Sequence, residues 1–172
     1  MPSGIITTMK LDPFYQQFLR AQFHNADIVF RFPPRHDLLM RLECFLTKTP
    51  LNYKRQDYGE NTFRIELPYM EHKDVMYYNY LSENSQALFA QRVKDFYRMI
   101  VHELFADYRR KGFFKTEIVY LIIEDFSFTT SDYDRILKDF NRFVACEKSR
   151  RFTQRQKDNK KTSVKHTYSQ HS

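Results

Sequence analysis

Apolar residues recur at helical spacing along most of the chain and predict its main elements. Asp12 followed by Pro13 is typical of an N-cap and a first helical residue, and the apolar positions after them predict a helix over about 11–24. A second apolar stripe, at 38–46, follows Asp37, which we expect to cap this helix. Both helices have one apolar face, so each is predicted to pack on a common core.

The longest stripe predicts a helix over about 85–111, whose last residues are basic and complement the helix dipole. Gly112 suits the position after its C-terminus. A helical stretch at 116–125, a short break and a capped helix then form a pair over about 116–144. Ser131, with Asp134 three residues on, predicts the start of the second helix of this pair.

Strand-like patterns are short and few. Residues 63–67 alternate between apolar and polar, and the β-prone segment 28–32 ends at two prolines, so the two segments could pair. Residues 69–84 fit neither period. The predicted fold is therefore α+β and predominantly α-helical. It is a helical bundle around the long helix with a minor two-stranded β element and a helix-turn-helix-like pair.

The length and the apolar content predict one folded domain with two extensions. A chain of 172 residues fits a single core, and an aromatic content of 17% indicates compact packing. We expect a flexible N-terminus at 1–10, a single folded domain at 11–146 and a basic, disordered tail at 147–172.

The net charge of +7 lies almost entirely in the tail. Residues 147–172 carry eight basic and two acidic residues, which leaves 20 basic and 19 acidic residues in the other 146. The chain is thus a nearly neutral domain with a basic extension. Its largest apolar run is far too short for a membrane span, so we expect no membrane partner.

The residues that carry chemistry form no recognisable catalytic or metal motif. Cys44 and Cys146 are far apart, which favours a reducing, cytoplasmic location over a disulfide framework. His102 and Glu103 begin an HExxH pattern, but Ala106 stands where the second histidine is required. With three glycines in the chain, no phosphate-binding loop is present. We therefore expect no cofactor, no metal and no enzyme activity.

The pair at 116–144 resembles a helix-turn-helix in outline, and its second helix presents a basic stripe. Arg135, Lys138 and Arg142 fall within about 60° of one another, opposite the apolar face. Such side chains can contact phosphates or guanine edges. However, residues 131–147 hold three basic and four acidic residues, and the usual turn glycine is missing near Ser127. An ordinary αα-hairpin with a charged outer face explains the same pattern.

The tail can supply the missing positive charge. Its candidate phosphate contacts are Lys148, Arg150, Arg151, Arg155, Lys157, Lys160 and Lys161. The alternatives are a solubilising terminus or docking on an acidic protein surface.

Six tyrosines between residues 53 and 80 suit single-strand stacking, core packing or a protein interface. The leading prediction is a non-catalytic nucleic-acid-binding protein that binds duplex DNA, with RNA as another polyanion. The alternative is a protein-interaction or assembly module, and a homodimer stays open.

Overall fold

The computed structural model describes the chain from residue 2 to residue 168, with side chains described for residues 4–150 and 152–154. The fold is α+β and mostly helical, as predicted. Its elements are β1 (Pro2–Lys10), α1 (Pro13–Gln22), α2 (Asp37–Phe45), β2 (Thr62–Pro68), α3 (Glu83–Arg110), α4 (Lys115–Asp125) and α5 (Tyr133–Tyr168), with 3-10 turns at Gly59–Asn61 and Thr130–Asp132.

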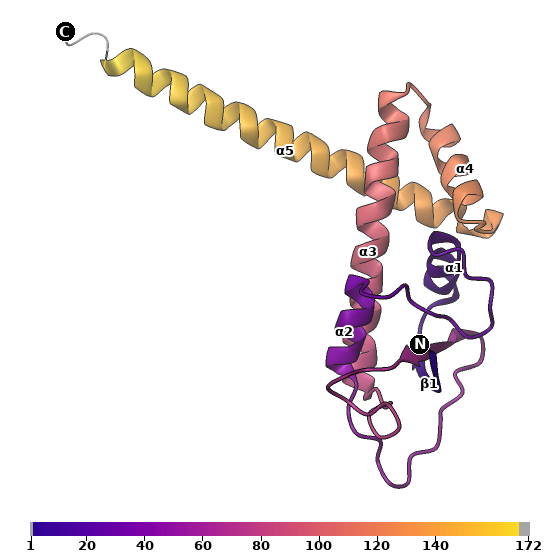
Figure 1. Cartoon of the computed structure of the whole chain (residues 1–172). Coiled ribbons are helices and arrows are strands. Elements are labelled where there is room, and N and C mark those ends of the chain that lie inside the picture. The colour runs from indigo at the N-terminus through magenta and orange to yellow at the C-terminus, as the bar shows by residue number, and fades with distance from the viewer. Residues whose placement is uncertain (1, 169–172) are drawn as a thin grey trace.

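Helix α3 is the centre of the fold, as its long apolar stripe predicts. Helix α2 lies along one part of α3, while α1 and α4 lie on another side and α5 crosses it (Figure 1). The residues of α3 that face this core are fully buried and recur every four positions: Phe89, Val93, Tyr97, Val101 and Phe105. The ring of Tyr97 meets Phe14 and Phe18 of α1 edge-on, with centroids 5.2 Å apart in each case. Aromatic packing on α3 therefore organises the bundle.

The two-stranded sheet pairs β1 with β2, antiparallel, and so uses the N-terminal residues that were predicted to be flexible. Met9 lies opposite Phe63 and Thr7 lies opposite Ile65, and all four side chains are buried. The burial of Met9 and Thr7 against β2 explains why this segment is ordered as a strand. The sequence expectation of a flexible 1–10 is corrected here, because its pairing partner lies more than 50 residues away.

The segment 28–32, which was expected to be a strand, touches the sheet at one residue. Phe30 forms a single parallel bridge to Ile65, in which its N–H donates to the Arg64 carbonyl at 2.8 Å. The Glu66 N–H donates to the Phe30 carbonyl at 2.9 Å. The two prolines that follow carry no N–H and end the pairing. The predicted contact with residues 63–67 is present, but the main partner of β2 is β1.

Helix ends follow the sequence signals in part. Asp12 caps α1 by accepting a 2.9 Å hydrogen bond from the Phe14 N–H, and Gly112 adopts a positive φ of 89° after α3. The expected cap of α2 is wrong by one residue, because His36 accepts from the Leu38 N–H.

The start of α5 also differs from its prediction. Thr129 and Asp132 form a capping box around a 3-10 turn, and this turn absorbs Ser131. Helix α5 begins only at Tyr133.

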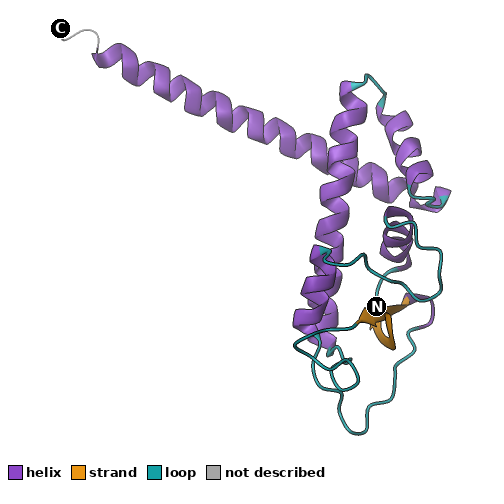
Figure 2. Ribbon diagram, viewed as in Figure 1, coloured by secondary structure: helices purple, strands orange, loops and turns teal. Residues whose placement is uncertain are grey.

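Helix α5 continues through the predicted boundary at residue 146 and ends at Tyr168, so the segment expected to be disordered is helical as far as it is described. Residues 113–172 contain no glycine and no proline, and the segment is rich in Lys, Arg and Gln, which are good helix formers. At 1.5 Å per residue, a helix of 36 residues is about 54 Å long. Its second half projects away from the rest of the molecule as an isolated rod (Figures 1 and 2).

Candidate nucleic-acid interface

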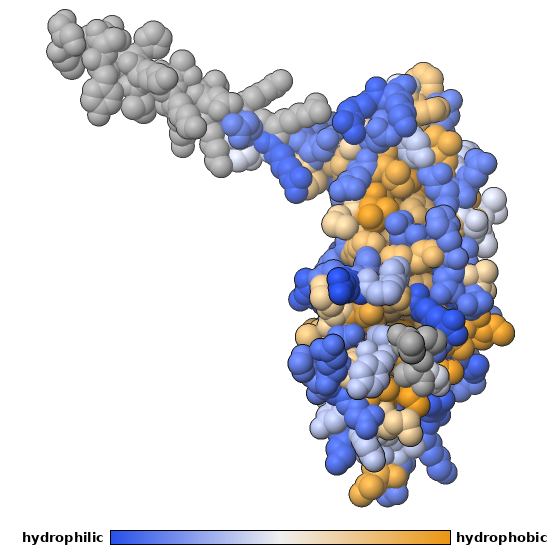
Figure 3. All heavy atoms as spheres, viewed as in Figure 1, coloured by the Kyte–Doolittle hydropathy of each residue, from blue (hydrophilic) through white to orange (hydrophobic). Residues whose placement is uncertain are grey.

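Helix α5 has a packed half and a projecting half. In the packed half, Ile136, Phe140 and Phe143 are buried, and the Phe140 ring meets Phe105 of α3 at 5.1 Å between centroids. Near Glu147 the helix leaves the rest of the folded chain, residues 2–146, which we call the body. Hydrophilic side chains cover much of the visible surface around the point where α5 leaves the body, with apolar side chains exposed between them (Figure 3). We call residues 147–168 the projecting half of α5.

Arg135, the first residue of the predicted basic stripe, is committed to a contact within the fold. Its guanidinium pairs with the carboxylate of Asp12 at 3.2 Å. The same group lies 4.0 Å from the centroid of the Phe14 ring and 4.8 Å from that of Tyr15. Arg135 therefore holds the start of α5 on the start of α1 and is not a free donor for a phosphate.

Lys138 and Arg142 are both exposed on the outer face of α5. Arg142 pairs with Asp139 one turn earlier, at 3.2 Å, but most of its side chain stays in solvent. An exposed pair of this kind is weak and can exchange its partner. The structure thus leaves two of the three predicted stripe residues accessible.

The turn between α4 and α5 is part of the core. Phe126 and Phe128 are buried, and the Phe128 ring stacks on Phe14 with centroids 4.3 Å apart. Ser127 adopts a φ of 52°, the left-handed conformation that a turn glycine would favour. The predicted pair consists of two packed helices, and the turn between them is packed on α1 rather than open to solvent.

The end of α3 lies beside the base of the projecting half. Arg109 forms an ion pair with Glu147, which joins these two places directly. Arg110 and Lys111, which the sequence analysis assigned to the helix dipole, are exposed here. Lys111 pairs with Asp107 at 2.7 Å, one turn earlier on α3. The basic residues of the tip between α3 and α4 therefore lie next to the base of the projecting half, where Arg109 pairs with Glu147 and both Arg110 and Lys111 pair with Asp107.

Two adjacent aromatic rings are exposed at the same tip. The exposed fractions of Phe113 and Phe114 are 42% and 76%, and the Phe113 ring meets Tyr108 edge-on at 5.8 Å. The exposed ring pair was not among the sequence-based predictions. The available signal was two aromatic residues placed directly after the helix-ending Gly112 and next to basic residues, where no core position is expected.

The predicted contacts in the tail fall into two groups. Lys148 and Arg150 are exposed on the described part of α5. The side chains of the remaining predicted contacts lie outside the described residues, although their backbone is helical: Arg151, Arg155, Lys157, Lys160 and Lys161.

Burial lowers the pKa of His102, and the nearby positive charges of Arg98 and Arg150 add to this shift.

Two features are absent from the part of the chain that the structure describes: a cluster of metal ligands and a membrane-spanning helix. Among these residues, no group of three or more His, Cys, Asp or Glu side chains is placed to hold a metal ion. No helix among them is both long enough and apolar enough to cross a membrane. Cys44 and Cys146 are exposed free thiols.

The fold and this surface define a mostly helical α+β domain that carries a projecting basic helix. Comparisons with protein-family models, with curated proteins and with solved structures give no match to the chain.

Proposed function

We propose that this protein binds nucleic acid without catalysing a reaction, with duplex DNA as the ligand and the projecting half of α5 as the main contact. One observation carries the proposal. The body is nearly neutral, while the projecting half holds eight basic and two acidic residues on one extended helix. A polyanion is the ligand that such a concentration of positive charge attracts most strongly.

The composition of the projecting half disfavours a helical partner. A coiled coil needs apolar residues every three to four positions on one face. Residues 147–168 contain only Phe152, Val164 and Tyr168 as apolar or aromatic residues. A helix that is polar all round is marginal in water and gains stability from a partner that neutralises its charges. Phosphates provide this neutralisation.

The shape of the helix favours a duplex. Its 22 projecting residues span about 33 Å, close to one turn of B-form DNA, and the major groove is wide enough to admit an α-helix. Lys138 and Arg142 on the packed half, together with the tip between α3 and α4, would supply further phosphate contacts. The exposed rings of Phe113 and Phe114 add a place for an unpaired base to stack. Arg135 has a structural role in this arrangement.

The test measures the binding of labelled duplex and single-stranded DNA by fluorescence anisotropy over a salt series. It compares the whole chain with a chain that ends at Ser149, which keeps Glu147 and its partner Arg109. The truncation removes seven basic residues and one acidic residue from 28 and 21, which leaves 21 and 20, a net charge of +1.

The whole chain should bind duplex DNA at low salt, with log K falling linearly against log salt. The truncated chain should bind at least about 100-fold more weakly at low salt, with a slope smaller by up to about 6. The absence of binding by the whole chain at low salt would contradict the proposal. Tighter binding of single strands than of duplex would assign the ligand to the stacking surface instead.

A second candidate function, a protein-interaction or assembly module, rests on an exposed apolar surface at the other end of the molecule. The loops around residues 47–53 and 76–80 are held together by the bridge between Thr47 and Tyr80. Leu51, Met76 and Tyr77 on these loops are well exposed. Such a surface suits a protein partner or a second copy of the chain.

This candidate predicts either self-association through these loops or docking of the basic tail on an acidic protein. Light scattering over a concentration series checks the first of these, with the double variant Leu51→Ser, Tyr77→Ser as control. The two exposed thiols fit a reducing compartment such as the cytoplasm under either function.

A further inference from the structure

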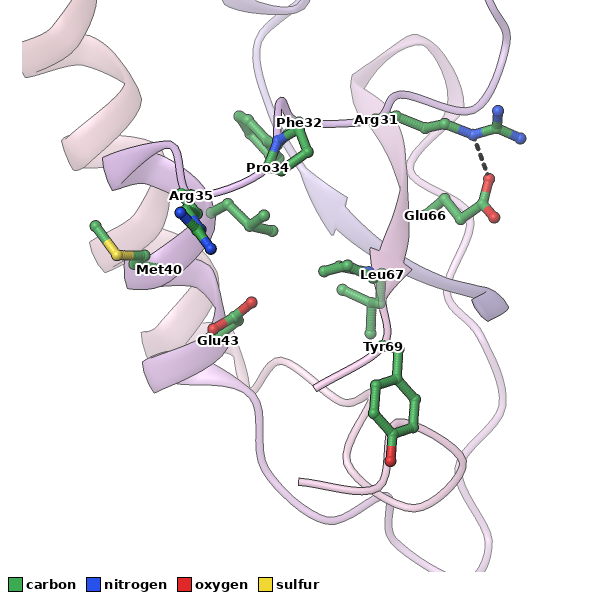
Figure 4. Close-up of a pocket in the computed structure, with 11 residues that line it drawn as sticks. Arg31, Phe32, Pro34, Arg35, Met40, Glu43, Glu66, Leu67 and Tyr69 are labelled. Carbon is green, nitrogen blue, oxygen red and sulfur yellow. Dashed lines mark hydrogen bonds and ion pairs between the residues drawn. The ribbon is translucent and has the colours of Figure 1, made fainter. Parts of the chain in front are cut away.

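A cavity of about 600 Å³ lies between α2 and the end of β2, away from the projecting half of α5. Its walls come from residues 31–35, from one side of α2 and from the residues at and after the end of β2 (Figure 4). Volumes of this size are typical of small-molecule sites, which are mostly apolar and carry a few polar groups that fix the orientation of the ligand.

The inner surface of the cavity is apolar. Phe32, Leu39 and Leu67 line it and are themselves buried. Met40 and Tyr69 stand at its rim with a large part of their side chains in solvent. An apolar ligand would cover Met40 and Tyr69 and remove water from them, whereas Phe32, Leu39 and Leu67 form a floor that exposes almost no area. Removal of water from the two exposed side chains is the main source of affinity in such a site.

The charged residues around the cavity are not equivalent. Arg31 pairs with Glu66 at 2.5 Å, so these two groups neutralise each other at one side (Figure 4). Glu43 lines the wall two turns into α2. Arg35 lines the cavity and has no hydrogen bond or ion pair with any described residue. Its guanidinium is the one positive group of this cavity wall that is unpaired within the described chain.

The backbone at Arg35 does not favour an arginine. The His36 N–H donates to the Pro33 carbonyl at 3.2 Å, which closes a turn with Pro34 in second position and Arg35 in third. Arg35 has a φ of 61°, as in a type II turn, where glycine is strongly preferred at this position. Unlike His24 and Ser127, which share a positive φ, Arg35 does not end a helix. Arg35 thus keeps an unfavourable conformation while its exposed, unpaired side chain lines the mouth of an apolar cavity.

We propose that this cavity binds a small molecule with an apolar body and one anionic group, of the class of aromatic or aliphatic carboxylic acids. The apolar body packs against Met40 and Tyr69 above the floor formed by Phe32 and Leu39, and the anion pairs with Arg35. The carboxylate of Glu43 repels an anion, so the ligand is oriented with its charged group toward Arg35. This inference is independent of the proposed nucleic-acid binding.

Two fluorescent probes that differ in the anionic group test the proposal on the whole chain. The first is 8-anilinonaphthalene-1-sulfonate, and the second is the uncharged N-phenyl-1-naphthylamine. Arg35→Gly removes the guanidinium and relaxes the turn. The variant should bind the sulfonate about tenfold more weakly and the uncharged probe as well as the native chain does. Its melting temperature should be equal to that of the native chain or higher.

A pair of matched variants locates the site. Met40→Glu places a negative charge on the cavity wall, at a side chain that is 49% exposed, and should weaken sulfonate binding at least about tenfold. Met99→Glu makes the same change at a 51% exposed methionine of α3 that does not line the cavity, and should leave binding unchanged. Equal effects of the two variants, or unchanged sulfonate binding by Arg35→Gly, would overturn the proposal.

Discussion

The two halves of α5 belong to one helix and are built on opposite principles. The packed half contributes Ile136, Phe140 and Phe143 to a core of aromatic rings around α3. The projecting half contributes almost no apolar residue and nearly all of the excess charge. The body is thus specified by side-chain packing within the chain. The projecting half has little packing of its own, and under the proposed function its helix should gain stability when a bound polyanion neutralises its charge.

The largest expected effect is on stability, and it comes from making the same change, phenylalanine to alanine, in each half of α5. Phe140→Ala in the packed half, at a buried ring that meets Phe105 of α3, should destabilise the fold by about 3–5 kcal/mol. Phe152→Ala in the projecting half, at a ring that is 65% exposed, should change stability by less than about 0.5 kcal/mol. Chemical denaturation measures both. A large loss from Phe152→Ala would show that the projecting half packs on something in the free protein.

A smaller effect separates Arg135 from Arg142. Arg135→Gln loses an ion pair and two cation–π contacts and should cost about 1–2 kcal/mol of unfolding free energy. Arg142→Gln loses one exposed pair and should cost less than about 0.5 kcal/mol. For DNA binding, Arg142→Gln should have the larger effect. It should reduce the slope of log K against log salt by about 1, while Arg135→Gln should leave the slope unchanged. Equal costs in stability would contradict the structural role of Arg135.

Phe114→Ser should raise stability and lower the binding of single strands. Phe114 is the N-cap residue of α4, and its N–H already donates to the Glu117 carboxylate at 2.7 Å. A serine there completes a capping box, worth about 0.5–1 kcal/mol. Loss of the exposed ring should weaken single-strand binding about fivefold. Thermal denaturation and anisotropy check these outcomes. An unchanged single-strand affinity would leave the ring without a role in stacking.

The smallest effect is a dependence of stability on pH that arises in the body. Burial lowers the pKa of His36, whose Nδ1 accepts a hydrogen bond from the Leu38 N–H at 3.2 Å. The unfolded chain, with the ordinary pKa of 6.5, therefore binds a proton more readily than the folded chain. Stability is full above that value and falls as the pH decreases below it. Burial also lowers the pKa of His102, so this residue changes stability with pH in the same direction.

His36→Asn tests this assignment, because asparagine also accepts at an N-cap and does not titrate. Melting temperatures at pH 7.5 and pH 5.5 should differ less in the variant than in the native chain. An identical fall in both proteins would assign the dependence to other groups.

Local signals predicted the elements whose determinants are close in sequence. Asp12 with Pro13 fixed the start of α1, and Gly112 fixed the end of α3. β1 was missed because its partner strand lies more than 50 residues later, and residues 5–9 show no clear period of their own. The helical tail was missed for a different reason. A polar helix leaves no apolar stripe, so only the absence of glycine and proline indicated it.

The sequence alone could predict the positive charge of the candidate site, but it could not predict which of the basic residues pair with acidic residues of other elements. The excess of basic residues in 147–172 is a property of the sequence alone. The engagement of Arg135 depends on Asp12, which lies 123 residues earlier, and no helical wheel of α5 contains it. Likewise, the meeting of Arg109 with Glu147, which adds the tip between α3 and α4 to the surface, follows only from how α5 crosses α3.

The central claim is that the charge of the projecting half supplies the affinity for nucleic acid, while its helical shape favours a duplex. The most direct measurement is the salt dependence of duplex DNA binding by a full-length variant in which seven basic residues become glutamine: Arg150, Arg151, Arg155, Lys157, Lys160, Lys161 and Lys165. Glutamine preserves helix propensity, so the helix is retained. The variant should show a slope of log K against log salt that is smaller by up to about 6, with duplex binding nearly lost at physiological salt. A slope and an affinity equal to those of the native chain would contradict the claim.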